Sequence, residues 1–159
     1  MLVVLARHGK AIESAASGRD RDRTLRPRGH RQAEFLGSAL AAMDTRPQRV
    51  IASPYPRAWE TAAYIAKALA LDPIADERLE VGCSAGELIE VIATAAETDL
   101  PAACFVGHNP TLEDALGVLI DGPAGPPVRV RTGEAFCVEI DPADPMGRSR
   151  VVAQIRLED

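Results

Sequence analysis

Three short apolar runs, each followed at once by a basic or polar cluster, constrain the fold of this chain more than any other feature. The runs are Leu2–Ala6, Val50–Ala52 and Ala103–Val106. Runs of this length and composition predict strands buried on both faces, as in a parallel sheet covered by helices. Because ligands bind outside the carboxyl ends of such strands, we expect the three clusters to meet in one crevice.

The clusters consist of residues that suit an anion. They are Arg7-His8-Gly9, the segment from Ser53-Pro54 to Arg57, and Gly107-His108-Asn109-Pro110. The formal net charge of -5 argues against a general nucleic-acid binder, since that affinity comes mainly from Lys and Arg neutralising phosphates. Positive charge is therefore expected to act locally, in a pocket.

The segments between the predicted strands have the spacing of helices. Pro27 suits a first helical turn after a polar loop over residues 10–26, and a second helix can begin at Ser53-Pro54. A short extended piece lies near 73–75, and two final strands over 135–140 and 150–157 are expected to pair as an antiparallel edge. The sequence thus predicts one α/β domain over residues 1–159, with three α/β/α layers around a mostly parallel sheet.

The cysteines and the amino terminus predict the cellular compartment. Cys83, Cys104 and Cys137 form no CxxC pair and are expected to be free thiols in a reducing environment. No stretch approaches the length of a membrane span, and Met1 leads directly into a predicted strand. We therefore expect a cytoplasmic protein without membrane contact.

His8 is the candidate nucleophile. A neutral imidazole at a strand end can attack phosphorus and form a phosphohistidine intermediate, and Gly9 would let a ligand approach the backbone. A lone histidine in this position is more often structural, so the prediction depends on its neighbours. Arg7 and Arg57 offer planar guanidinium groups that match phosphate oxygens, and Arg57 falls in a first helical turn that favours an anion.

His108 has the same placement as His8, between a buried strand and a helix. It could donate a hydrogen bond to a phosphoryl oxygen as imidazolium, or orient and charge the pocket. The structural alternative is a hydrogen-bonded histidine that closes the strand end. Gly9, Ser53 and Asn109 belong to the same clusters and are predicted to contact substrate.

Other phosphatase chemistries do not fit this sequence. None of the cysteines has an Arg six positions later, as a cysteine phosphatase requires, and no DxDxT-like strand end appears. HExxH and paired carboxylate runs are also absent, so we expect neither a metal nor another cofactor.

These motifs resemble the histidine phosphatase superfamily, the phosphoglycerate mutase-like group. The resemblance covers Met1 to about Gly133 and rests on RHGKA at residues 7–11, SPYPRAWETA at 53–62 and VGHNP at 106–110. The short length and the segment from Asp22 to Gly29 look most similar to SixA-type phosphohistidine phosphatases. This resemblance implies a phosphoglycerate mutase-like fold.

The resemblance also implies residue roles. His8 would become phosphorylated while Arg7, Arg57 and His108 form the phosphate pocket, and the substrate-side arginine of the family falls on Arg23. Many members use a glutamate as general acid; Glu80 lies near that position without matching the motif cleanly, and Glu87 is a weaker candidate. Where relatives commonly carry a threonine before the proline, this chain has Arg26, which predicts a helix without a side-chain cap.

Three functions remain open at this stage. The leading hypothesis is a phosphohydrolase that dephosphorylates phosphohistidine on a signalling or phosphotransfer protein, since a phosphohistidine leaving group demands less of a general acid than an alkoxide. The first alternative is a small-molecule phosphomonoesterase or mutase that uses Glu80. The second is a binding module that holds phosphate without turnover.

Overall fold

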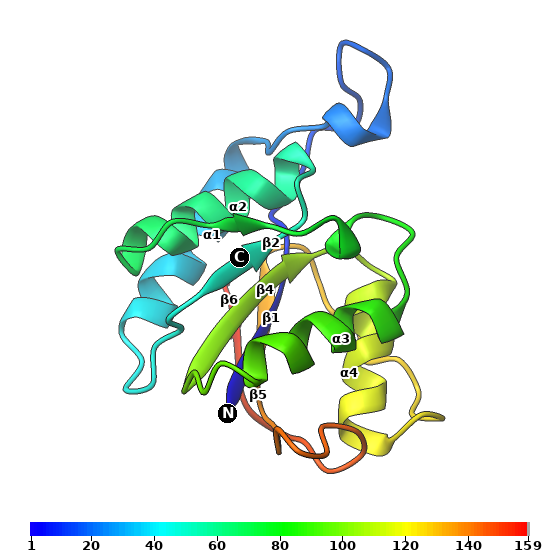
Figure 1. The fold of residues 1–159 in the computed structure, drawn as a ribbon. Coiled ribbons are helices and arrows are strands. Elements are labelled where there is room, and N and C mark those ends of the chain that lie inside the picture. The colour runs from blue at the N-terminus through cyan, green and yellow to red at the C-terminus, as the bar shows by residue number, and fades with distance from the viewer. Residues whose placement is uncertain (159) are drawn as a thin grey trace.

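The computed structural model, which describes residues 1–158, contains a six-stranded mixed sheet between two pairs of helices (Figure 1). The strand order is β3-β2-β4-β1-β5-β6. The first four strands in this order run parallel, and β5 is antiparallel to both of its neighbours. The strands are β1 (Leu2–Arg7), β2 (Val50–Ala52), β3 (Ile74–Ala75), β4 (Ala102–Gly107), β5 (Glu134–Glu139) and β6 (Arg150–Arg156). The predicted three-layer fold with an antiparallel edge is confirmed.

The helices are α1 (Pro27–Ala41), α2 (Pro56–Ala68), α3 (Ala85–Ala96) and α4 (Thr111–Asp121), with 3-10 turns η1 (Asp20–Asp22) and η2 (Glu77–Leu79). Helices α1 and α2 pack together over one face of the sheet, and α3 and α4 cover the other (Figure 1). Helix α1 begins at Pro27 as predicted, and Arg26 gives it no side-chain cap. Helix α2 begins two residues later than Pro54, and η1 interrupts the predicted loop.

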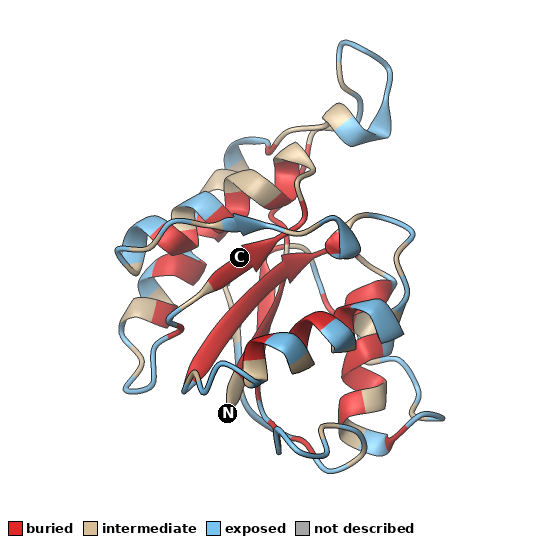
Figure 2. Ribbon diagram, in the orientation of Figure 1, coloured by how far each residue is buried: buried red, intermediate tan, exposed pale blue. Residues whose placement is uncertain are grey.

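The alternation of side chains along β1 divides the core into two clusters. Val3 and Leu5 pack against α3 and α4, whereas Val4 and Ala6 pack against α1 and α2. Figure 2 shows the central strands buried along their length, while β6 forms a more exposed edge. The three cysteines are free, and Cys104 and Cys137 lie in the core. No helix within residues 1–158 has the length and apolar character needed to cross a bilayer.

A close backbone contact holds α1 against the segment that follows β1. A Cβ on Gly9 would lie 2.5 Å from the carbonyl oxygen of Gly29, and a Cβ on Gly29 would collide with the backbone carbonyl of Lys10. The backbone N–H of Arg26 also donates to the Lys10 carbonyl at 3.0 Å. This contact fixes the backbone next to His8.

We predict that Gly29→Ala lowers the free energy of unfolding by about 1–3 kcal/mol, because the added methyl group has no room against a backbone oxygen. The matched control is Gly86→Ala in α3, where the nearest atom to a new Cβ is the Ser84 Oγ at 3.7 Å. That variant is expected to be neutral or to gain up to about 1 kcal/mol of helix propensity. Urea denaturation compares the two, and equal stability of the two variants would contradict the prediction.

Candidate active site

The register of the parallel strands brings the three clusters together. In the β1–β4 pair Arg7 lies opposite Gly107, and in the β2–β4 pair Ala52 lies opposite Val106. The residue after each strand end is therefore placed at the same edge of the sheet. His8 and His108 consequently lie with their ring centroids 5.1 Å apart, and Ser53 lies within hydrogen-bond distance of His108.

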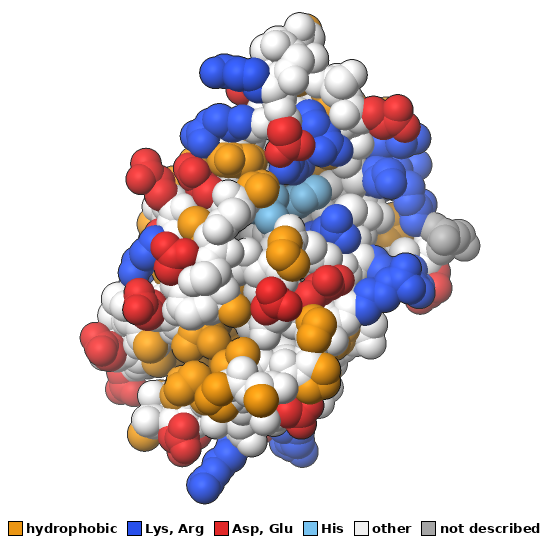
Figure 3. Space-filling view, turned by 90° about the vertical axis from the view of Figure 1, so that its right-hand side faces the viewer, with side chains coloured by type: hydrophobic (Ala, Val, Ile, Leu, Met, Phe, Trp, Pro, Cys, Tyr) orange, Lys and Arg blue, Asp and Glu red, His pale blue; other side chains and the backbone are white. Residues whose placement is uncertain are grey.

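A cavity of about 320 Å³ opens at this edge. Figure 3 shows histidine side chains in a hollow with Lys and Arg side chains beside it. Of the predicted site residues, the cavity brings together Arg7, His8, Arg23, Arg57, His108 and Asn109, and Lys10, Ala11, Asp20, Val81 and Thr132 complete its lining. Its lining is therefore rich in cations and contains one carboxylate.

The ring of His8 has a defined tautomer. Its Nδ1 lies 2.8 Å from the carbonyl oxygen of Gly9, and since a carbonyl only accepts, Nδ1 carries the proton of the neutral ring. Burial and the positive charges of Arg57, Arg7 and Arg23 lower the pKa of His8 to about 4. His8 is thus a neutral imidazole at pH 7 with its lone pair on Nε2, which is the form a nucleophile needs.

His108 is 3% exposed and lies between Ser53 and Tyr55. Its Nε2 lies 2.8 Å from the Ser53 Oγ, and the Tyr55 ring packs edge-on against it. Burial, together with the charges of His8 and Arg57, lowers the pKa of His108 to about 3. A bound anion would offset both effects, so this ring is placed to gain a proton when negative charge enters the cavity.

Hydrogen bonds to Asp20 hold the guanidinium of Arg57 in place. Arg57 is the second residue of α2, and it donates from Nη1 to the Asp20 backbone oxygen at 2.8 Å and from Nη2 to the Asp20 carboxylate at 3.0 Å. Arg23 donates to the other oxygen of the same carboxylate at 2.8 Å. The Arg23 hydrogen bond, followed by that of Arg57, lowers the pKa of the Asp20 carboxyl group.

Several buried polar atoms around the cavity have no hydrogen-bond partner within the described residues. They are the Nε atoms of Arg7 and Arg57, the Nδ1 of His108 and the Oδ1 of Asn109. Buried donors without partners are rare in folded proteins and are costly. Three of the four atoms are nitrogens that can donate a hydrogen bond, and their concentration in the basic clusters suits an anion, whereas the Asn109 Oδ1 can only accept.

Three predicted contact residues also hold neighbouring parts of the protein in place. The Gly9 N–H donates to the Thr61 Oγ1 at 3.0 Å, and the absence of a side chain on Gly9 makes room for α1. Ser53 is fully buried and holds His108. Asn109 donates from Nδ2 to the Val130 carbonyl and to Glu113, so this side chain fixes the 128–133 segment beside the cavity.

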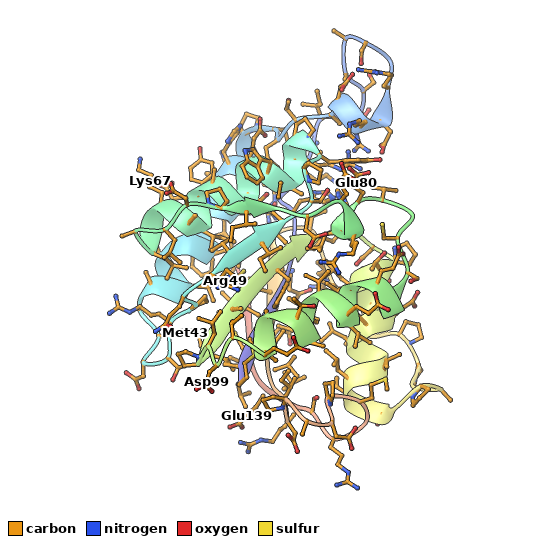
Figure 4. All side chains as sticks on the ribbon, in the orientation of Figure 1. Met43, Arg49, Lys67, Glu80, Asp99 and Glu139 are labelled. Atoms are coloured by element: carbon orange, nitrogen blue, oxygen red, sulfur yellow. The ribbon has the colours of Figure 1, made fainter. Side chains whose placement is uncertain are left out.

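The two predicted general acids lie outside the cavity lining. Glu80 follows η2 (Figure 4) and accepts from Arg21 at 3.3 Å, with 23% of its side chain exposed. Glu87 accepts from the Ser84 N–H at 2.7 Å and completes a capping box at the start of α3. The remaining histidine, His30, packs against Tyr64 away from the cavity.

Sequence reasoning missed three residues that shape this site. Asp20 clamps two arginines, Thr61 joins Gly9 to the first turn of α2, and Gln32 donates to the Thr132 carbonyl while accepting from the Lys10 N–H. Each acts through contacts with residues distant in the sequence, which no local pattern marks. Only the spacing of Asp20 from Arg23 offered a signal. Within residues 1–158, no three His, Cys, Asp or Glu side chains are grouped so as to hold a metal ion.

Comparison with known proteins gives one family match. The model of the histidine phosphatase superfamily (branch 1) matches residues 3–103. These residues include the first two clusters and end at the second residue of β4, before the third cluster. No curated protein matches the chain significantly.

Similar solved structures share the fold over nearly the whole chain. The protein histidine phosphatase SixA complexed with tungstate is 22% identical with a TM-score of 0.85, covering 98% of this chain and 97% of that one. A SixA protein of Agrobacterium tumefaciens, described as a candidate phosphohistidine phosphatase, is 26% identical with a TM-score of 0.77 and coverages of 97% and 96%. The α-ribazole phosphatase of Shigella flexneri is 18% identical with a TM-score of 0.69 and coverages of 95% and 95%.

The lowered pKa values give a prediction for titration. Followed by the NMR signals of the imidazole rings, His8 and His108 should remain neutral from pH 8 to pH 5 and take up protons only near pH 4 and pH 3, respectively. Saturating inorganic phosphate should raise both midpoints, because the anion favours the charged rings. Midpoints near the ordinary value of about 6.5 in the phosphate-free protein would contradict the burial argument.

Proposed function

Because the chain belongs to the histidine phosphatase superfamily, we propose that it is a phosphatase that forms a phosphohistidine intermediate on His8 and removes phosphate from phosphohistidine in a signalling or phosphotransfer protein. The observation that carries this proposal is the neutral His8 with its free Nε2 in a cavity lined by Arg7, Arg57 and His108. In this proposal the cations hold the phosphoryl oxygens, and the imidazole supplies the nucleophile.

In the first step the Nε2 lone pair of His8 attacks phosphorus. A bond forms between Nε2 and phosphorus, and the bond from phosphorus to the leaving nitrogen breaks. The Nδ1–H of His8 remains hydrogen-bonded to the Gly9 carbonyl oxygen, and this bond stabilises the positive charge that develops on the ring. Arg7 and Arg57 neutralise the equatorial oxygens, and the Nδ1 of His108, which has no partner among the described residues, donates a hydrogen bond to a phosphoryl oxygen without transferring its proton.

In the second step a water molecule attacks the phosphorus of phospho-His8. The bond to Nε2 breaks, inorganic phosphate leaves, and the ring returns to its neutral form with the proton still on Nδ1. The same cations serve both steps, because both pass through a metaphosphate-like arrangement with charge on three oxygens. No group other than this chain and water is needed for the atoms and charges to balance.

The carboxylates favour phosphohistidine over a phosphate ester. Asp20 is the single carboxylate that lines the cavity, and its ion pairs with Arg23 and Arg57 keep it ionised and unsuited to donate a proton. An alkoxide leaving group needs an acid, whereas the imidazole of a phosphohistidine protonated on its other nitrogen leaves as a neutral ring. The site thus suits phosphohistidine, because its leaving group does not need a general acid from the enzyme.

The first alternative, a small-molecule phosphomonoesterase, is consistent with the fold, since the α-ribazole phosphatase shares it. The second alternative, a binding module without turnover, leaves the free Nε2 of His8 without a role. Turnover measurements separate these alternatives from the proposal.

We predict that His8→Ala lowers the turnover of a phosphohistidine peptide by at least about 10³-fold and removes the labelled enzyme intermediate. A single-turnover reaction with ³²P-labelled peptide, quenched in alkali because phosphohistidine is acid-labile, measures both. The matched control is His30→Ala, which removes the histidine that packs against Tyr64 outside the cavity. Equal retention of label by wild type and His8→Ala would show that His8 is not the nucleophile.

We also predict that Glu80→Gln changes kcat/KM for the phosphohistidine peptide by less than about threefold. Its carboxylate pairs with Arg21 outside the cavity lining and holds no reacting atom. The same variant is assayed on a panel of sugar and nucleotide phosphates. If wild type prefers these esters and the variant loses that activity, the phosphomonoesterase alternative is correct and the substrate proposed above is wrong.

A further inference from the structure

A second cavity of about 250 Å³ lies next to the catalytic cavity. It is lined by Lys10, Arg26, Arg28, Gln32, Arg131, Thr132, Arg156 and Leu157, and we call it the basic groove. Among residues 1–158, five of the eight lining residues are cations and none is a carboxylate. In a chain with a formal net charge of -5, this concentration of positive charge is a local departure from the rest of the surface.

The basic groove is continuous with the catalytic cavity, because Lys10 and Thr132 line both. In Figure 3, Lys and Arg side chains gather beside the histidines and continue toward one edge of the molecule. A phosphorylated side chain inserted toward His8 would therefore bring the surface that carries it over this groove. A free phosphate ion would not reach both places at once.

The floor of the groove is fixed by the hydrogen bonds of one buried side chain. Gln32, which is 4% exposed, accepts from the Lys10 N–H at 2.8 Å and donates to the Thr132 carbonyl at 3.1 Å. These bonds join the end of β1, helix α1 and the segment before β5. Four of the five cations therefore project from three segments whose backbones are held in place, and the fifth, Arg156, projects from β6. Binding need not order these backbones first.

Most of the positive charge in the groove is not neutralised by the protein. Within residues 1–158, Lys10, Arg26 and Arg131 take part in no ion pair, and all three are exposed. Arg156 lies at 3.9 Å from carboxylate oxygens of Glu134 and Glu158, which is long for an ion pair. Surfaces with unpaired charges of one sign attract and orient partners of the opposite sign.

We propose that the basic groove docks an acidic surface of the phosphorylated substrate protein, next to the phosphohistidine that enters the catalytic cavity. This inference rests on the function proposed above. The groove determines which protein is dephosphorylated, whereas the catalytic cavity determines the chemistry. Its cations outside the catalytic cavity act on KM and on the association rate, and they leave kcat unchanged.

The test uses two synthetic peptides with one chemically phosphorylated histidine, flanked by glutamates in one peptide and by glutamines in the other. Free phosphohistidine is the third substrate. Wild type should prefer the acidic peptide by about five- to tenfold in kcat/KM, and added salt should reduce this preference. In Arg26→Ala/Arg131→Ala the preference should disappear through KM, with turnover of free phosphohistidine unchanged.

The matched control is Arg46→Ala/Arg148→Ala. It removes the same charge from two exposed arginines that lie before the starts of β2 and β6, at the end of the sheet away from the groove. This variant should keep the preference for the acidic peptide. Loss of the preference in the control would show that net charge matters and the groove does not.

Three further outcomes separate the two proposals. Equal turnover of both peptides by wild type, or a preference that survives in Arg26→Ala/Arg131→Ala, overturns the docking inference alone. Stronger turnover of a small bisphosphate than of the acidic peptide assigns the groove to a second phosphate group and also overturns it. Failure of wild type to hydrolyse free phosphohistidine or either peptide overturns the proposed function and the docking inference together.

Discussion

The parallel register between β1 and β4 is the constraint on which the rest of the site depends. Because Arg7 lies opposite Gly107, the residues that follow both strands face each other, and two histidines exactly one hundred positions apart come into ring contact. A shift of one residue in this pairing would turn the buried side chains of β4 toward the wrong helices. The core on both faces therefore fixes the register, and the register fixes the site.

The site's electrostatics follow from this placement. The clusters lie where strands and helices converge, so their side chains are largely cut off from water, and the charges of Arg7 and Arg57 act on each histidine through a medium that screens them weakly. Neutral imidazoles beside permanently charged guanidiniums are the result. In the proposed function this arrangement supplies a neutral nucleophile at neutral pH and a cationic cavity for phosphate, at the cost of buried polar atoms without partners among the described residues.

The sequence predicted the parts of the structure that depend on local pattern. Apolar runs predicted the buried strands, and Pro27 predicted the first residue of α1. The contacts of Asp20, Thr61 and Gln32 could not be predicted, because the local sequence around a polar residue does not show which distant residue it will contact in the fold. The sequence predicted that Gly9 lets a ligand approach the backbone. It could not predict that the backbone of Gly9 packs against that of Gly29, because this contact depends on how α1 crosses the segment after β1.

The cations of the catalytic cavity and the cations of the basic groove differ in how strongly salt screens their attraction for an anion. Arg57 is 4% exposed, so its attraction for a phosphoryl group is weakly screened by salt, whereas Arg26 and Arg131 are exposed, and their attraction for a partner falls off within about 8 Å at physiological ionic strength. The remainder of the surface is net acidic and repels an acidic partner at the same range. In the docking proposed above, attraction over one face and repulsion elsewhere orient the partner before contact, with its phosphorylated side chain toward His8.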